Sequence, residues 1–243
     1  MNAKLIISPL AFATTLVVTA FAAGAHGSLQ AAEPTSKILL TQQFATRPVT
    51  KVEIGDFHFA PGQLAPKHTH LAPVFGYVSK GKIYYQVEGQ EPVLLNAGDV
   101  FYEPVGPNIV HFDNASQTEE AVFTDINFER DGEPFIVFPV PLTEKIDRRS
   151  FPSQQPQVAA ANTMNVYEQT LPAGGALPLL AAGTTGYGYV AQGSVSVRVR
   201  GEAPIVYTAG QTFYQPTSSV GTQVSSASTS NDTKVIRFVL SKH

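Results

Sequence analysis

The chain has 243 residues, with 16 Lys and Arg against 19 Asp and Glu, and a formal net charge of −3 at neutral pH. This balance, without a run of basic residues, excludes an electrostatic surface for nucleic acid. There is no cysteine, which excludes disulfides, iron–sulfur clusters and thiolate chemistry. Only 14% of the residues are charged, whereas the chain has 19 Gly and 18 Pro, a composition typical of an all-β protein with many turns.

Residues 1–27 have the pattern of a secretory signal peptide. Lys4 supplies a short positive region, an apolar segment runs from Leu5 to Val18, and small residues at 23–25 and 25–27 each fit a cleavage site. An uncleaved membrane anchor is the alternative, but the segment is rich in Thr, Ser and Ala and makes a weak membrane span. We therefore expect an exported protein, secreted or periplasmic, with no membrane contact after cleavage.

The rest of the chain contains two copies of one unit. Gly81 and Gly193 lie 112 positions apart, and this offset aligns a long block without gaps. The residues that match are mainly glycines, prolines and aromatic residues: Gly62 and Gly174, Pro66 and Pro178, Gly76-Tyr77-Val78 and Gly188-Tyr189-Val190, Gly89 and Gly201, Pro92 and Pro204, Gly98 and Gly210, Phe101-Tyr102 and Phe213-Tyr214, and Pro104 and Pro216. Matches at turn positions of this kind indicate an internal duplication.

Each copy has the pattern of short β-strands. Residues 82–88 and 194–200 are bounded by glycines, and the second segment alternates cleanly between apolar and polar residues. The mature region offers no capped segment with helical periodicity. We predict an N-terminal barrel at 39–137, a Pro-rich connector at 138–160 and a C-terminal barrel at 161–243.

Two motifs in the first copy resemble those of a known family. Residues 62–70 read Gly, five residues, then His-x-His, and Gly81 falls where such a motif ends. Residues 98–106 read Gly, five residues, then Pro-x-Gly. In this order the two motifs are similar to those of the cupin superfamily. The resemblance implies two tandem double-stranded β-helix (jelly-roll) barrels, a bicupin.

The His-x-His pattern has a simple physical reading. Side chains at positions i and i+2 of a strand point to the same face, so His68 and His70 can direct both imidazoles into one barrel interior. Imidazole nitrogens about 2.0–2.2 Å from a common point suit a divalent transition metal. We expect one such ion, which can be Fe, Mn, Ni, Cu or Zn.

The sequence also departs from the family pattern. The family places a glutamate ligand after the second histidine with three or four residues between them, at the positions where this chain has Val74 and Phe75. The third histidine is expected at Ile109, but His111 lies two residues later. Because a shift of two residues keeps the strand face, we expect His111 to serve as the third metal ligand.

The expected site is therefore His68, His70 and His111, with open positions for water and substrate. Glu103 is a substitute carboxylate whose direction beside Pro104 cannot be read from the alternation. His58 is a further candidate, as a fourth ligand or as a residue that supports the ligands, although a lone histidine is more often an ordinary hydrogen-bonded residue.

The second copy lacks every candidate ligand. At the offset of 112, His68 becomes Leu180, His70 becomes Ala182, Val74 becomes Gly186 and His111 becomes Gln223. The strand glycines and prolines persist at the same offset. We infer that the C-terminal barrel is structural, packing against the first barrel or closing its mouth.

Two classes of function stay open. As an enzyme, the protein would use the metal to act on a small organic substrate, in the oxygenase, lyase or isomerase chemistry that the resemblance implies. As a binding module, it would hold a small ligand or a metal without turnover. The sequence identifies no catalytic residue, and exposed barrel edges are compatible with a homodimer but do not identify the contacting strand.

Overall fold

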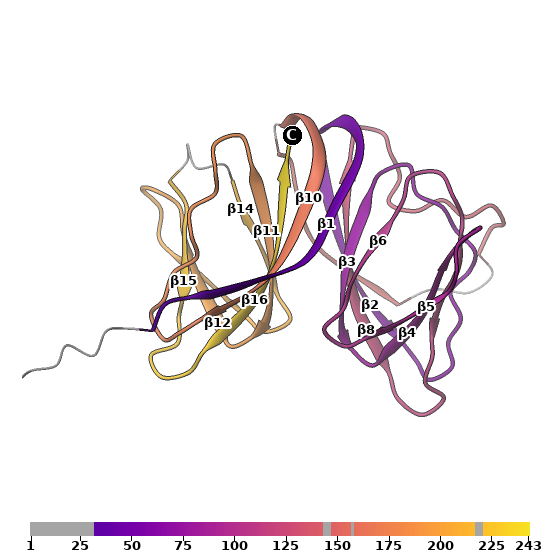
Figure 1. The fold of residues 1–243 in the computed structure, drawn as a ribbon, viewed down its shortest axis with the longest axis horizontal. Coiled ribbons are helices and arrows are strands. Elements are labelled where there is room, and N and C mark those ends of the chain that lie inside the picture. Colours follow the sequence, from indigo (N-terminus) through magenta and orange to yellow (C-terminus); the bar gives the residue numbers. More distant parts are fainter. Residues whose placement is uncertain (1–31, 143–146, 157, 217–220) are drawn as a thin grey trace, which may run out of the picture. The chain divides into compact units, whose positions relative to one another are not determined.

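The computed structural model describes residues 32–142, 147–156, 158–216 and 221–243 (Figure 1). The signal-peptide prediction at 1–27 lies outside the described residues. Within them the regular structure is β-strand, and no helix is long and apolar enough to cross a membrane. The strands are β1 Thr35–Val49, β2 Lys51–Phe59, β3 Val74–Lys80, β4 Lys82–Val87, β5 Val93–Asn96, β6 Val100–Glu103, β7 Ile109–Asn114, β8 Ala121–Glu129, β9 Arg148–Gln154, β10 Val158–Leu171, β11 Thr185–Gln192, β12 Ser194–Arg198, β13 Ile205–Thr208, β14 Thr212–Gln215, β15 Gln223–Ser226 and β16 Thr233–Ser241.

The first barrel consists of two antiparallel sheets. The larger has the strand order β6-β3-β8-β2-β9, and the smaller has the order β5-β4-β7. Apolar side chains from both sheets, among them Phe57, Ile83, Phe112 and Phe123, form one buried cluster between them. This is the jelly-roll architecture that the sequence predicts, and its filled interior positions the site described below.

The second barrel repeats this plan. Its sheets have the orders β1-β10-β16-β11-β14 and β13-β12-β15, and they enclose their own cluster, which includes Val195, Phe213 and Val235. The duplicated units in the sequence are therefore duplicated folds. The prediction of an all-β protein with two tandem jelly-roll barrels is confirmed.

The first strand of each copy joins the sheet of the other copy. β1 pairs with β10 in the second barrel, with Thr35 opposite Thr170 and Val49 opposite Val158, and the two strands run side by side in Figure 1. β9 lies within the segment 138–160 and pairs with β2 in the first barrel. Each large sheet therefore contains one strand that belongs to the other sequence copy.

A further apolar cluster contains residues of both large sheets. It includes Phe75 and Phe128 from the first barrel and Tyr187 and Phe238 from the second. The rings of Phe128 and Tyr187 meet edge to face, with centroids 5.6 Å apart. Packing of the C-terminal barrel against the first, one of the two arrangements expected from the sequence, is what the structure has.

The repeated glycine of β3 and β11 makes room for an aromatic ring on the neighbouring strand. Gly76 lies opposite Phe101, and Gly188 lies opposite Phe213. A methyl group at either glycine would overlap the ring across from it. The Gly and Phe matches of the internal repeat therefore preserve one packing contact in both barrels.

This contact gives a first prediction. Gly76→Ala is expected to lower the free energy of unfolding by about 1–3 kcal/mol, because it overpacks the strand pair against Phe101. Thermal denaturation measures the change, and Phe101→Leu in the same chain should recover part of it. Unchanged stability of Gly76→Ala would show that the ring has room to move.

Candidate metal centre

A short segment between β2 and β3 positions the two motif histidines. His68 bridges to Ile109 and His70 to Val105, while Thr69 between them pairs with Val137 on the other side. The alternation buries both imidazoles, with exposures of 6% for His68 and 1% for His70. The structure thus brings His68 and His70 to one interior site, as their spacing predicts.

A carboxylate reaches the same site from the neighbouring strand. Glu103 ends β6, is 1% exposed, and lies directly opposite Val74 in the β3–β6 register. Residues opposite each other in an antiparallel pair point to the same face. Val74 occupies the first of the two positions at which the resembled motif places its glutamate, so the chain supplies the carboxylate from across the strand pair.

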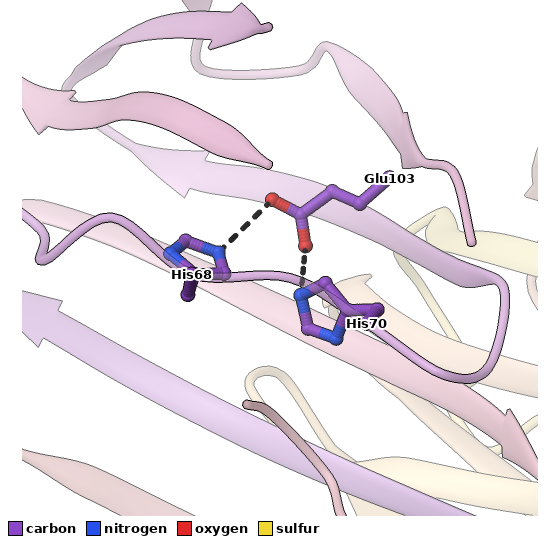
Figure 2. Close-up of side chains that lie close together, drawn as sticks. All are labelled: His68, His70 and Glu103. Atoms are coloured by element: carbon purple, nitrogen blue, oxygen red, sulfur yellow. Dashed lines mark ion pairs between the residues drawn. The ribbon is translucent and has the colours of Figure 1, made fainter. Parts of the chain in front are cut away.

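The three side chains converge in Figure 2. Nε2 of His70 lies 3.0 Å from Oε2 of Glu103, and Nε2 of His68 lies 3.7 Å from Oε1. One donor atom from each residue falls within 4.8 Å of the other two. Among the described residues, His70 Nε2 and Glu103 Oε2 have no hydrogen-bond partner despite their proximity, an arrangement expected of atoms directed at a shared ion.

The hydrogen bonds of the two Nδ1 atoms determine the tautomer of each imidazole, and therefore which nitrogen has a free lone pair. Nδ1 of His68 lies 2.8 Å from the carbonyl oxygen of Pro66, and Nδ1 of His70 lies 3.0 Å from that of Phe135. A carbonyl only accepts, so each Nδ1 donates its proton and a neutral ring keeps its lone pair on Nε2. Such outer hydrogen bonds hold metal-ligating histidines in place. The donor set therefore fits a divalent transition metal.

His111 is not part of this group. Its side chain is 46% exposed, with Nδ1 2.7 Å from Asp113 and the ring against Tyr84. The cause is a register shift in the β4–β7 pair, where Gln86 faces His111 but the next residue, Val87, faces Ile109. One extra residue in β7 turns the side chain to the opposite face. The donor set that we propose therefore has Glu103 in place of His111.

His58 also lies elsewhere. It is on β2, where its ring nitrogens face Glu120 at 3.0 Å and Asp56 at 3.1 Å. These partners occupy both nitrogens, which is the ordinary role of a hydrogen-bonded histidine rather than that of a fourth ligand.

A family comparison agrees with the fold and with the motifs. Residues 55–127, which span β2 to β8 and contain the three converging side chains, match the family model of the cupin domain. Residues 55–127 therefore form a cupin domain. No curated protein matches the sequence.

Solved structures share the two-barrel fold at low sequence identity. AerE from Microcystis aeruginosa is 13% identical with a TM-score of 0.55, covering 82% of this chain and 98% of AerE. Salicylate 1,2-dioxygenase from Pseudaminobacter salicylatoxidans is 15% identical with a TM-score of 0.53, over 79% of this chain and 71% of the dioxygenase. Vicilin from Corylus avellana (hazelnut) is 14% identical with a TM-score of 0.53, over 84% and 86%. A dioxygenase and a vicilin share this fold, so the fold alone does not assign an activity.

Without a bound metal ion, the Glu103 carboxylate and the facing imidazoles stabilise each other's charged forms. Burial alone would raise the pKa of Glu103, but the facing imidazoles of His70 and His68 outweigh it and hold this pKa at about 2. Burial lowers the pKa of His68, but the facing Glu103 carboxylate outweighs that effect and raises it above its ordinary value. The metal-free site is therefore an ion pair at mildly acidic pH.

This ion pair predicts a pH window of stability for the metal-free protein. The stabilisation from Glu103 is present above its ordinary pKa of 4.5 and is lost as pH falls toward 2, whereas that from His68 is present below 6.5 and is lost as pH rises through its raised pKa. The stability difference between wild type and Glu103→Gln should therefore be largest between pH 4.5 and 6.5, at about 3 kcal/mol. Chemical denaturation across pH 3–8 measures it, and a difference that does not change with pH would refute the ion pair.

Asp125 is a polar residue of the site that the sequence analysis did not single out. It lies in the middle of β8, opposite Gly55 and Gly76, is 7% exposed, and its Oδ1 has no hydrogen-bond partner. Burial raises the pKa of Asp125 well above its ordinary value, and the nearby Glu103 adds to the effect. The signal was present in the sequence, because Phe123, Asp125 and Asn127 alternate on the interior face of the strand.

A small cavity adjoins the site. Its volume is about 20 Å³, which holds about one water molecule. Three polar residues, His68, Glu103 and Asp125, line one part of it. The remaining lining residues are apolar: Phe57, Phe59, Ala65, Pro66, Phe112, Phe123, Ile136 and Phe138. The site thus has little free volume, is apolar on most sides, and is polar where the donors converge.

Proposed function

We propose that the N-terminal cupin barrel holds one divalent transition metal through His68, His70 and Glu103 and acts on a small organic substrate. The observation that carries the proposal is the convergence of His68, His70 and Glu103, in which His70 Nε2 and Glu103 Oε2 have no hydrogen-bond partner among the described residues. Two histidines and one carboxylate with open positions form the donor set of non-haem Fe(II) oxygenases, so Fe(II) is the first choice among Fe, Mn, Ni, Cu and Zn.

The bound ion would supply Lewis acidity or, as Fe(II), a redox partner for dioxygen. The chain contributes the rest. The carbonyls of Pro66 and Phe135 hold the imidazoles in one tautomer. The Glu103 carboxylate offsets part of the charge of the ion. Burial raises the pKa of Asp125 at the cavity wall, so this carboxyl group would be the proton donor to a bound substrate oxygen, and the aromatic wall would limit the access of water.

A second function is favoured by the size of the cavity. At about 20 Å³ it accepts one water or a similarly small ligand but no ring-sized substrate unless wall residues such as Phe138 move. A protein that holds a metal with one small ligand and does not turn over would fit this small cavity. The two functions share the donor set and differ in whether the wall opens.

Dioxygen uptake separates the two functions. Protein reconstituted with Fe(II) without air would be moved to aerated buffer containing salicylate, gentisate or smaller hydroxy acids, and uptake followed with an oxygen electrode. Substrate-dependent uptake in wild type that is absent in Glu103→Gln supports the oxygenase. Tight Fe(II) binding with no uptake and no change in any added compound supports the binding module.

We also propose that the protein is exported, with cleavage of residues 1–27. The support is the sequence pattern alone. The intact mass of protein from the extracellular or periplasmic fraction gives the first residue directly. A full-length mass in a membrane fraction would instead favour the uncleaved anchor.

A further inference from the structure

The second barrel has a counterpart of the metal centre in which every polar group is changed. In the first barrel Val74 pairs with Glu103 and Gly76 with Asp125. At the same register in the second barrel, Gly186 pairs with Gln215 and Gly188 pairs with Arg237. An acid has thus been replaced by an amide at one position and by a cation at the other.

Arg237 is buried in the interior of the second barrel. Its residue exposure is 4%, and it shares the interior face of β16 with Val235, a member of the core cluster. Nη2 donates a hydrogen bond to Oε1 of Gln215 over 2.7 Å, and Nε has no partner. A guanidinium carries five N–H donors, so most of its capacity is unused by the described residues.

No carboxylate of the described second barrel faces Arg237. From residue 158 to the end, the sequence has three acidic residues, Glu168, Glu202 and Asp232, and residues 217–220 contain none. Glu168 pairs with Lys234 at 3.3 Å, while Glu202 and Asp232 are exposed. Burial lowers the pKa of Arg237 to about 10, which leaves it charged at neutral pH. A buried charge of this kind requires a partner.

Two of the replaced residues are also smaller than their counterparts in the first barrel. Ala182 occupies the sequence position that corresponds to His70, and Gly186 that of Val74, so an imidazole and an isopropyl group are absent. Leu180, at the position of His68, takes up part of the volume, with Cδ1 3.3 Å from where a Cβ of Gly186 would lie.

We propose that the second barrel binds one small carboxylate anion beside the hydrogen-bonded pair of Arg237 and Gln215. The guanidinium presents parallel N–H groups that match the two oxygens of a carboxylate. The anion would supply the negative charge that no described carboxylate of the barrel provides to Arg237. The Gln215 amide accepts from Arg237 through Oε1 and can turn its N–H group to the anion. The proposed sites of the two barrels thus have opposite polarity, one for a cation and one for an anion. Anion binding in the second barrel does not require a metal in the first barrel.

Acetate is the probe for this site. Isothermal titration of the full chain, freed of metal by a chelator and kept at constant ionic strength with a bulky sulfonate buffer, should show one saturable acetate site. The affinity should be unchanged in His68→Ala/His70→Ala, which removes the first barrel as a source of binding. It should fall at least 10-fold in Arg237→Met and stay unchanged in Arg198→Met, which alters an exposed arginine of the same barrel.

A second variant covers the case in which Arg237→Met does not fold. Gln215→Glu retains the arginine and provides a counter-ion within the barrel, so it should bind no acetate and be more stable than wild type in acetate-free buffer. Absence of acetate binding by wild type overturns the proposal. So does binding that survives in Gln215→Glu, or binding that disappears only when His68 and His70 are replaced.

Discussion

Moving the carboxylate across the strand pair is expected to restore a metal site that its removal abolishes. Glu103→Val should weaken metal binding by more than about 100-fold, because the loss of a ligand exceeds the 10–100-fold cost of losing an outer hydrogen-bond partner. Val74→Glu in the same chain should recover most of the affinity, because residues 74 and 103 face each other on one side of the sheet. Competition with a chromophoric chelator measures both affinities.

The same strands provide a matched control. Phe75 and Tyr102 form the neighbouring pair, whose rings stack on the opposite face. Exchanging them, as Phe75→Tyr/Tyr102→Phe, disturbs the same strands without reaching the site and should leave metal affinity unchanged. If a folded Val74→Glu/Glu103→Val protein binds no better than Glu103→Val, the carboxylate position is not interchangeable and the proposed donor geometry is incorrect.

Loading the site with metal is expected to raise the melting temperature strongly. At a free metal concentration 1,000 times Kd, binding to the folded state alone adds about 4 kcal/mol. For a chain of 243 residues this corresponds to a rise of about 8–16 °C. Calorimetry with and without a chelator measures the rise, which should be nearly absent in Glu103→Gln. An equal rise in that variant would place the bound ion elsewhere in the protein.

The sequence predicts the two-barrel fold because its clearest pattern, the internal repeat, consists of residues that shape strands and turns. The matched glycines and aromatic residues of the repeat correspond to real contacts, such as Gly76 with Phe101 and Gly188 with Phe213. The exchange of β1 and β9 between the sheets could not be predicted in the same way. Local alternation determines which face of a strand is buried, but not which sheet edge the strand joins.

The site could be predicted in part for similar reasons. His68 and His70 follow a regular alternation, and their period of two holds. The inference for His111 assumes the same period across β7, where the register shift beside Val87 breaks it. Glu103 stands before Pro104, where alternation gives no direction, and only the pairing with Val74 identifies it as the third donor of the proposed centre.

The identity of the third ligand is the point on which the proposed centre depends. The most direct measurement is the metal content of purified wild type, Glu103→Gln and His111→Ala by elemental mass spectrometry after identical reconstitution. We predict close to one equivalent in wild type and in His111→Ala, and little in Glu103→Gln. Metal retained by Glu103→Gln but lost from His111→Ala, or no metal in wild type, would contradict a centre built from His68, His70 and Glu103.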